Sequence, residues 1–439
     1  MMIEGPDKSR RLSCLPALAM IVALLSGCGG SASSSGGGGG GGGSATTVTF
    51  KFTGGTPTAV AARIGTGAFT AQNPGTLSLS IPSGTTDFAV GYVCTSGSSS
   101  GFPGQIQEAE EIVFEASTAD GTSFTGPCPG ASLSTTTTGT LTASVDASAI
   151  PNASILNLAV QNDGLLFEGV LQSPVGNLSA LGPVGNDRVE VLAYSSTMQG
   201  PLEEELGLVG AKNFTAQAVP GSLNGGETVV LGSSDETTPE PISYSGVPLG
   251  YDPPSTIATF NMGNGGGFVL AASAAGQYPA MPAGAIESGD SYFFLSTAHN
   301  SANVGETVIS LVNSPSGGPV SIAFPAPWAY AGPTPAALPT FNFNYSGFSG
   351  MQSASLVWMP SSSAENIFEV NATPSYQNGS AALDFPDLSS RKGFLASPAS
   401  GTNVTWLAEM VENSAGAFQS ASSSATTSAV ENSGSFTVP

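Results

Sequence analysis

Short segments in which apolar and polar residues alternate dominate the body of the chain. In the first of them Val48, Phe50 and Phe52 alternate with Thr49 and Lys51. The same pattern recurs at residues 77–81, 88–94, 112–116 and 141–145. Successive side chains of a strand point to opposite faces, so this alternation predicts strands with one buried face. We therefore expect residues 45–148 to form one β-sandwich of the immunoglobulin-like or transthyretin-like type.

Short phrases in the middle of the chain repeat in a fixed order. The five pairs are 191–195 with 269–273, 226–230 with 305–309, 241–243 with 319–321, 248–251 with 327–330, and 259–261 with 340–342. Their offsets lie between 78 and 81 residues. A nearly constant offset predicts a duplicated β module, with copies at 149–262 and 263–345. Because glycine, serine, threonine and valine are abundant, recurrence of turn and strand phrases without duplication is the alternative.

The remaining residues, 346–439, are predicted to form a further β module. Leu356 and Trp358 mark one of its strands, Trp406 and Met410 another, and Val438 the end of the last. Glycine (58 residues) and proline (32) are frequent, whereas charged residues make up 9% of the chain. Such a composition suits strands joined by many turns. The predicted fold class is all-β, with tandem sandwich modules.

The chain is strongly acidic, with 31 Asp and Glu against 9 Lys and Arg and a formal net charge of -22. Like charges repel, so phosphate backbones and anionic headgroups are unfavourable partners for its surface. The charge argues against nucleic-acid binding.

The amino-terminal residues carry a targeting pattern. Lys8, Arg10 and Arg11 precede an apolar run from Leu15 to Leu25, which is too short to cross a bilayer as a helix but has the length of a signal-peptide core. The following Leu25-Ser26-Gly27-Cys28 resembles the lipobox of bacterial lipoproteins. This resemblance implies that residues 1–27 are removed and that Cys28 becomes a lipid-bearing first residue. An ordinary cleaved secretory signal is the alternative.

The resemblance also implies a place for the mature protein. Two or more acyl chains hold a protein stably on a bilayer. Gly29 follows the cysteine, where lipoproteins retained in the inner membrane often carry aspartate, so the outer membrane or cell surface is favoured. Residues 29–44 contain only Gly, Ser and Ala. With Cys28 they form a predicted tether, a random coil that spans roughly 20–25 Å.

Four cysteines are present, and two of them remain for the folded body. Cys14 lies in the signal and Cys28 takes the lipid, which leaves Cys94 and Cys128. An isolated pair in an exported protein predicts a disulfide. Cys94 shares its strand face with Phe88 and Tyr92, so the bridge is expected in the core. No tryptophan accompanies the pair, which speaks against an antibody-like domain.

Catalytic motifs are scarce. The single histidine, His299, lies in a polar stretch and is expected in a solvated loop, which argues against a Ser-His-Asp site. Acidic clusters occur at Glu108, Glu110 and Glu111, at residues 203–205, and at Asp235 and Glu236. Paired carboxylates could serve a glycosidase, but solvated surface charge is the simpler interpretation. No calcium-loop spacing occurs, so neither a metal nor another cofactor is expected.

One aromatic pair could contact a sugar. Trp328 and Tyr330 lie two residues apart among prolines, where their rings could form a glycan platform. In the other repeat copy Leu249 replaces the tryptophan and Tyr251 the tyrosine, which favours an apolar packing role instead.

These patterns lead to two functional hypotheses. The first is a non-enzymatic, lipid-anchored envelope or surface protein that binds a glycan or an envelope protein, mediates adhesion, or has a structural role. The alternative is a secreted polysaccharide hydrolase that uses an unrecognised carboxylate pair.

Overall fold

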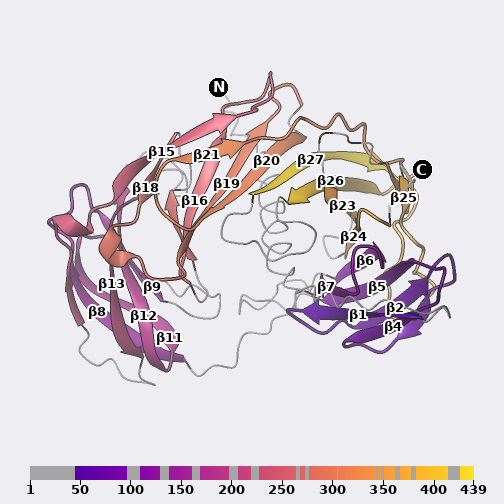
Figure 1. The fold of residues 1–439 in the computed structure, drawn as a ribbon, viewed down its shortest axis with the longest axis horizontal. Helices are drawn as coiled ribbons and strands as arrows, with labels where there is room; N and C mark the ends of the chain where they lie inside the picture. The colour runs from indigo at the N-terminus through magenta and orange to yellow at the C-terminus, as the bar shows by residue number, and fades with distance from the viewer. Residues whose placement is uncertain are drawn as a thin grey trace, which may run out of the picture. The chain divides into compact units, whose positions relative to one another are not determined.

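The structure is a computed structural model of an almost entirely β-stranded protein (Figure 1). It describes residues 45–95, 109–128, 138–160, 169–196, 206–218, 227–263, 267–271, 276–303, 305–342, 345, 347, 351–360, 366–376, 382–413 and 426–439. The predicted signal, Cys28 and the tether lie outside these residues. The described strands group into four successive sandwiches.

The first sandwich consists of seven strands in two sheets, drawn in indigo to purple in Figure 1. One sheet has the order β4-β1-β7 and the other contains β6-β5-β2-β3. Strand β1 pairs antiparallel with β4 and parallel with β7. The strands are β1 Thr46–Thr53, β2 Ala59–Ile64, β3 Thr70–Gln72, β4 Leu77–Ile81, β5 Asp87–Thr95, β6 Ala109–Ser117 and β7 Ser123–Pro127.

The alternation predicted from the sequence is confirmed in this sandwich. On β5 the side chains of Phe88, Val90, Tyr92 and Cys94 all lie in one buried cluster with residues from the facing sheet. Immunoglobulin constant domains place the first, second, fourth and fifth strands in one sheet. Here the second and fifth strands lie in the sheet opposite the first and fourth. The strand order therefore differs from that of an immunoglobulin constant domain.

The second sandwich repeats this arrangement, with the sheet β11-β8-β14 and the neighbouring strands β10-β9-β12-β13 of a larger sheet. Its strands are β8 Thr138–Asp146, β9 Ile155–Val160, β10 Gly169–Leu171, β11 Val175–Pro183, β12 Gly185–Ser196, β13 Leu206–Ala218 and β14 Glu227–Val230. The sequence analysis assigned residues 141–145 to the first sandwich. In the structure Leu141, Ala143 and Val145 belong to β8, which pairs with β11 and β14, and they pack in the second core. The first sandwich consequently ends before β8 and not at residue 148.

The third sandwich has the sheet β18-β15-β21 and the neighbouring strands β17-β16-β19-β20 of the larger sheet. A 3-10 turn, η2 Ser233–Asp235, precedes it, and a second one, η3 Ala283–Ala285, precedes β19. Tyr278, Tyr292, Phe294, Phe260 and Phe268 form a chain of aromatic contacts in its core. Its strands are β15 Thr238–Ser245, β16 Ser255–Asn261, β17 Gly267–Ala271, β18 Gln277–Ala280, β19 Ser291–His299, β20 Glu306–Ser314 and β21 Val320–Ala323.

The fourth sandwich, in orange to yellow in Figure 1, has a two-stranded sheet, β22-β25, and the neighbouring strands β27-β26-β23-β24 of the larger sheet. Trp358 on β23 is fully buried, stacks on Phe368 and contacts Phe385 edge to face. Its strands are β22 Thr340–Asn342, β23 Met351–Pro360, β24 Asn366–Ala372, β25 Ala382–Asp384, β26 Asn403–Asn413 and β27 Thr426–Thr437.

The repeating unit differs from the one predicted. The first strands of the four sandwiches begin at Thr46, Thr138, Thr238 and Thr340, roughly 100 residues apart. The matched phrases at 241–243 and 319–321 lie on β15 and β21, which are parallel neighbours within the third sandwich, with Ile242 opposite Val320. Such phrases resemble each other because both strands alternate toward the same core. The copies 149–262 and 263–345 therefore do not correspond to sandwiches.

The chain forms two compact units. Unit 1 comprises Met1–Ser132, Ala329–Ser422 and Glu431–Pro439, and unit 2 comprises Leu133–Trp328 and Ser423–Val430. Unit 1 thus combines the first sandwich with the fourth, except for residues 426–430 of β27, whereas unit 2 holds the second and third sandwiches. Within unit 1, β6 and β24 pair in parallel, with Ala109 opposite Asn366 and Glu115 opposite Ala372. Segments far apart in the sequence therefore fold together.

Candidate functional site

The predicted disulfide is present in the core of the first sandwich. Cys94 on β5 is bonded to Cys128, which directly follows β7, and their Cα atoms are 5.5 Å apart. Both residues are almost completely buried. The bridge connects the two sheets, as the position of Cys94 beside Phe88 and Tyr92 predicts.

His299 lies at the end of β19 and not in a loop. Its Nδ1 atom is 2.9 Å from the hydroxyl oxygen of Thr307, and burial lowers the pKa of the imidazole. A Ser-His-Asp site needs a carboxylate that orients the histidine and a hydroxyl that the histidine can deprotonate. The nearby carboxylate of Asp252 instead accepts a hydrogen bond of 2.6 Å from Ser301. These groups therefore do not form a nucleophilic triad.

The acidic clusters occupy separate structural positions. Glu110 and Glu111 are consecutive on β6, so their side chains point to opposite faces of the sheet. Glu111 is buried and accepts a 2.8 Å hydrogen bond from the Leu395 backbone, and burial raises its pKa to about 7. Asp235 accepts a hydrogen bond from the Gly232 backbone and pairs with Lys212. Residues 108 and 203–205 lie outside the described part of the chain.

The aromatic pair Trp328 and Tyr330 does not present two free rings. Trp328 is 3% exposed, and the ring of Tyr330 packs edge to face against Phe341 and Trp406. A glycan stacks on an accessible ring face, which Trp328 lacks in this structure. The packing role that the sequence favoured agrees with this burial.

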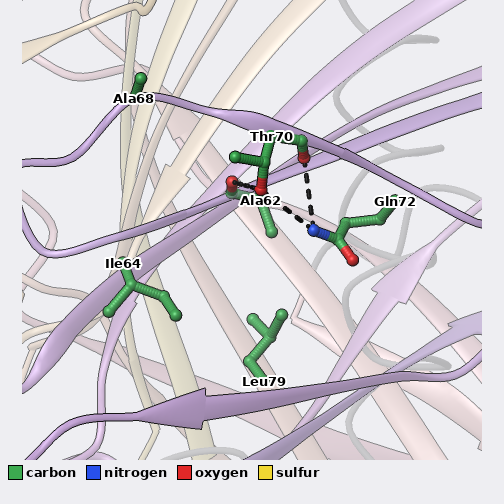
Figure 2. A pocket seen from close by; sticks show the side chains of 6 residues that line it. All are labelled: Ala62, Ile64, Ala68, Thr70, Gln72 and Leu79. Atoms are coloured by element: carbon green, nitrogen blue, oxygen red, sulfur yellow. Dashed lines mark hydrogen bonds between the residues drawn. The ribbon is translucent and has the colours of Figure 1, made fainter.

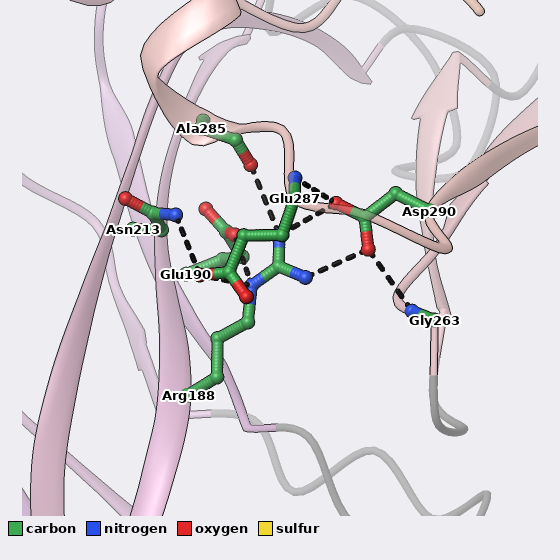
Figure 3. A network of polar contacts seen from close by, with 7 residues as sticks. All are labelled: Arg188, Glu190, Asn213, Gly263, Ala285, Glu287 and Asp290. Atoms are coloured by element: carbon green, nitrogen blue, oxygen red, sulfur yellow. Dashed lines mark hydrogen bonds and ion pairs between the residues drawn. The ribbon is translucent and has the colours of Figure 1, made fainter.

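Sequence reasoning missed a buried polar network around Arg188 on β12 (Figure 3). Its guanidinium donates to both oxygens of Asp290, at 2.7 and 2.8 Å. It also donates to one oxygen of Glu190, at 2.8 and 3.1 Å, and to the Ala285 carbonyl at 3.0 Å. The network joins β12 of the second sandwich to the segment that precedes β19 of the third.

The two carboxylates of this network have opposite properties. Asp290 is buried, which raises its pKa, but Arg188 and the backbone amides of Glu287 and Gly263 outweigh that effect, so the pKa lies below its usual range. Glu190 is fully buried, and this burial raises its pKa to about 8 despite the attraction of Arg188. Its second oxygen has no hydrogen-bond partner among the described residues. The guanidinium thus holds the pKa of Asp290 low, whereas burial keeps the pKa of Glu190 high.

This network connects the two sandwiches of unit 2. The backbone ladder between β13 and β17 contains the pair Gly207 and Ala271. The Tyr194 hydroxyl adds a 2.8 Å hydrogen bond to the Val269 carbonyl. Because the polar groups of Arg188 and Asp290 are used by each other and by the backbone, the network fits a structural clamp better than a substrate site.

A small pocket opens in the first sandwich between β2, β3 and β4 (Figure 2). Its volume is about 190 Å³, and its lining residues are Ala62, Ile64, Ala68, Thr70, Gln72 and Leu79. Sites for drug-sized ligands usually exceed about 300 Å³. The Gln72 amide donates to the Thr70 hydroxyl, and that hydroxyl donates to the Ala62 carbonyl. The polar groups therefore bond to one another and do not converge on a ligand.

The described residues contain neither a group of side chains that could hold a metal ion nor a helix that could span a membrane. No three histidine, cysteine or acidic side chains lie close enough there to hold a metal ion. Across the same residues, no helix has the length and apolar character that crossing a bilayer requires.

Comparison with known proteins gives little similarity. No protein family and no curated protein matches the chain. An adhesin-like protein from Bacteroides ovatus is 9% identical, over 38% of this chain and 73% of that protein, with a TM-score of 0.16. The TIE protein of Bacillus anthracis is 11% identical, over 65% of this chain and 51% of that one, with a TM-score of 0.14. Scores this low carry no argument about function.

Proposed function

We propose that this chain is a lipid-anchored protein of the bacterial cell envelope whose sandwiches bind a partner and do not catalyse a reaction. The observation that carries the proposal is the buried disulfide between Cys94 and Cys128. Disulfides persist in oxidising compartments and are rare in the cytosol. The bridge therefore supports export, as the signal-like residues 1–27 do independently.

The anchor is the second part of the proposal. Cys28 would carry the lipid, and residues 29–44 would separate the sandwiches from the membrane by roughly 20–25 Å. Four successive β-rich bodies on such a tether present much surface to the exterior. The outer membrane or cell surface is the proposed location.

The binding role is the third part. The described strands are used to build packed cores, and the candidate catalytic groups are either bonded to their neighbours or placed on different sheet faces. The net charge of -22 disfavours polyanionic partners. A neutral glycan or an envelope protein is the proposed class of partner.

Cell adhesion and glycan turnover should be measured together. Cells that carry the wild-type chain are compared with cells that carry Cys28→Ala, which would release the same folded body without the anchor. The proposal predicts that wild-type cells bind immobilised glycan or envelope protein, that the Cys28→Ala cells lose this binding, and that neither releases sugar. Polysaccharide cleavage by purified protein that is abolished in Glu110→Gln or Asp235→Asn would instead establish the hydrolase alternative.

A further inference from the structure

The fourth sandwich carries a row of buried carboxyl groups on the sheet face opposite its aromatic core. On β24 the core-facing Phe368 and Val370 alternate with Glu369 and Asn371. On β26 the residues Trp406, Ala408 and Met410 alternate with Leu407 and Glu409. Strand β27, the neighbour of β26, contributes Glu431.

Strand register places Glu369 and Glu409 on one face, and the buried Glu431 of the neighbouring strand β27 lies close enough for its charge to act on Glu409. Ser355 on β23 lies opposite both Asn371 on β24 and Glu409 on β26. Directly opposed residues of antiparallel strands point to the same side of the sheet. Glu369 lies opposite Val357, so it is two strands across and two residues along from Glu409, a separation of about 12 Å. Glu369, Glu409 and Glu431 are 6%, 2% and 6% exposed.

Among the described residues, Glu409 has neither a hydrogen bond nor an ion pair that would stabilise its ionised form. Neither of its oxygens has a hydrogen-bond partner among the described residues. In the described part of the chain, the acidic partners in ion pairs are Glu115, Glu190, Asp235, Glu287 and Asp290. No basic side chain there pairs with Glu369, Glu409 or Glu431. The cost of burying an unpaired carboxylate is avoided when the group holds a proton.

Glu369 lies on the same face as a further carboxyl group. Strand register places Glu110 of β6 opposite Ile367, two residues before Glu369, and Glu369 accepts a 2.6 Å hydrogen bond from the Asn371 amide. Neighbouring carboxylates repel each other when both are ionised, so this arrangement favours a proton on one of the pair. The Tyr92 hydroxyl of β5 is buried, and its pKa is raised by burial and by the charges of Glu369 and Glu110. The groups that face the row are therefore acidic.

We propose that the row of Glu369, Glu409 and Glu431, with Glu110, is a proton-dependent latch that keeps unit 1 folded when the carboxyl groups are protonated and loosens it when they ionise. The metal alternative is disfavoured because no metal-holding group of three ligands occurs in the described residues. This latch is independent of the anchor and of any partner.

The direction of the pH effect follows from linkage. Burial raises the pKa of Glu431 to about 7 and that of Glu369 above its usual value. Burial and the charges of Glu431 and Glu369 raise the pKa of Glu409 well above its usual value. A raised pKa in the folded state means that the folded protein binds more protons. The stabilisation is therefore complete at acidic pH and is lost as the pH rises through the folded-state pKa values.

The test is urea unfolding of the full chain from pH 5 to pH 9, followed by tryptophan fluorescence, to which Trp358 and Trp406 of unit 1 contribute two of the three tryptophans. We expect the midpoint to fall as pH rises, with the folding equilibrium constant dropping up to tenfold per pH unit for each group that ionises. Glu409→Gln should match the wild type at pH 5 and exceed it at pH 9. Glu412→Gln, on the same strand, should follow the wild type throughout. An unchanged midpoint across the range, or a fall that is equal in Glu409→Gln, would overturn the proposal.

A second measurement remains decisive if Glu409→Gln does not fold. The infrared band of protonated carboxyl groups should be present at pH 7 in the folded Glu190→Gln chain, which lacks the protonated carboxyl group of unit 2, and should disappear on unfolding at the same pH. Absence of that band in the folded protein would show that the row is ionised, and no proton-dependent latch would then exist.

Discussion

Val113 of the first sandwich lies opposite Val370 of the fourth in the parallel ladder of β6 and β24. The same face of the first sandwich contacts the segment that follows β25. A Cβ atom on Gly91 would lie 2.5 Å from Leu388 Cδ1, and the Leu395 amide donates to Glu111. The amino-terminal sandwich is therefore completed by residues more than two hundred positions downstream.

Separating these parts should unfold the first sandwich. A fragment of residues 45–132 would expose Val113 and Glu111, which are buried in the full chain. We expect it to aggregate or to lack near-ultraviolet circular dichroism, and a separate fragment of residues 329–439 to restore that signal. Residues 133–328, which cover most of unit 2, serve as the matched control and should fold alone. Cooperative unfolding of 45–132 by itself would contradict the account.

The disulfide should contribute strongly to the stability of unit 1. Reduction, or replacement of Cys94 and Cys128 by serine, removes a cross-link whose partners are 34 residues apart. For a loop of this length the loss in unfolding free energy is about 3–4 kcal/mol. Urea unfolding with and without reductant measures it, and the double variant should be insensitive to reductant. A stability unaffected by reduction would show that the core does not depend on the bridge.

Removing Arg188 should destabilise unit 2 more than removing the charge of Glu190. Arg188→Ala leaves the buried carboxylate of Asp290 uncompensated, with an expected cost of about 3–5 kcal/mol in unfolding free energy. Glu190→Gln should cost much less near pH 7, because Glu190 already holds a proton there. Thermal unfolding of both variants provides the comparison. Equal losses would show that Glu190 is ionised in the folded protein.

The same network predicts a pH dependence in unit 2. The pKa of Glu190 is raised to about 8 in the folded protein, so the folded state binds this proton more tightly than the unfolded state. The resulting stabilisation is complete below the unfolded-state pKa of Glu190. It is lost as the pH rises through about 8. Glu190→Gln should remove this decline. Melting temperatures of the wild type and the variant between pH 6 and pH 9.5 would measure the difference, and parallel curves would exclude the assignment.

Local patterns in the sequence predicted much of the first sandwich. The alternation around Phe88, Val90 and Tyr92 identifies the core face of β5, because burial imposes a period of two. It does not identify which strands pair. Leu141, Ala143 and Val145 show the same alternation as the strands before them, yet β8 begins the second sandwich. Pairing depends on chain connections that a local pattern does not contain.

The buried polar groups could not be predicted for a related reason. Glu190 lies between Val189 and Val191, and Glu409 between Ala408 and Met410. In an alternating strand such a glutamate indicates a solvent-facing side. These sheets bury both faces at those positions, which a single strand cannot reveal. The signal that the sequence did contain is its small number of basic residues. Nine lysines and arginines, of which Arg188 is one, face 31 acidic residues, so most acidic side chains have no basic partner.

The central claim is that Cys28 anchors these sandwiches outside the cytoplasm. Metabolic labelling of cells with palmitate tests it most directly, using the wild type, Cys28→Ala and, as a matched cysteine control, Cys94→Ser. The account predicts label in the wild type and in Cys94→Ser, and none in Cys28→Ala. An unlabelled wild-type chain, or label that persists in Cys28→Ala, would contradict it.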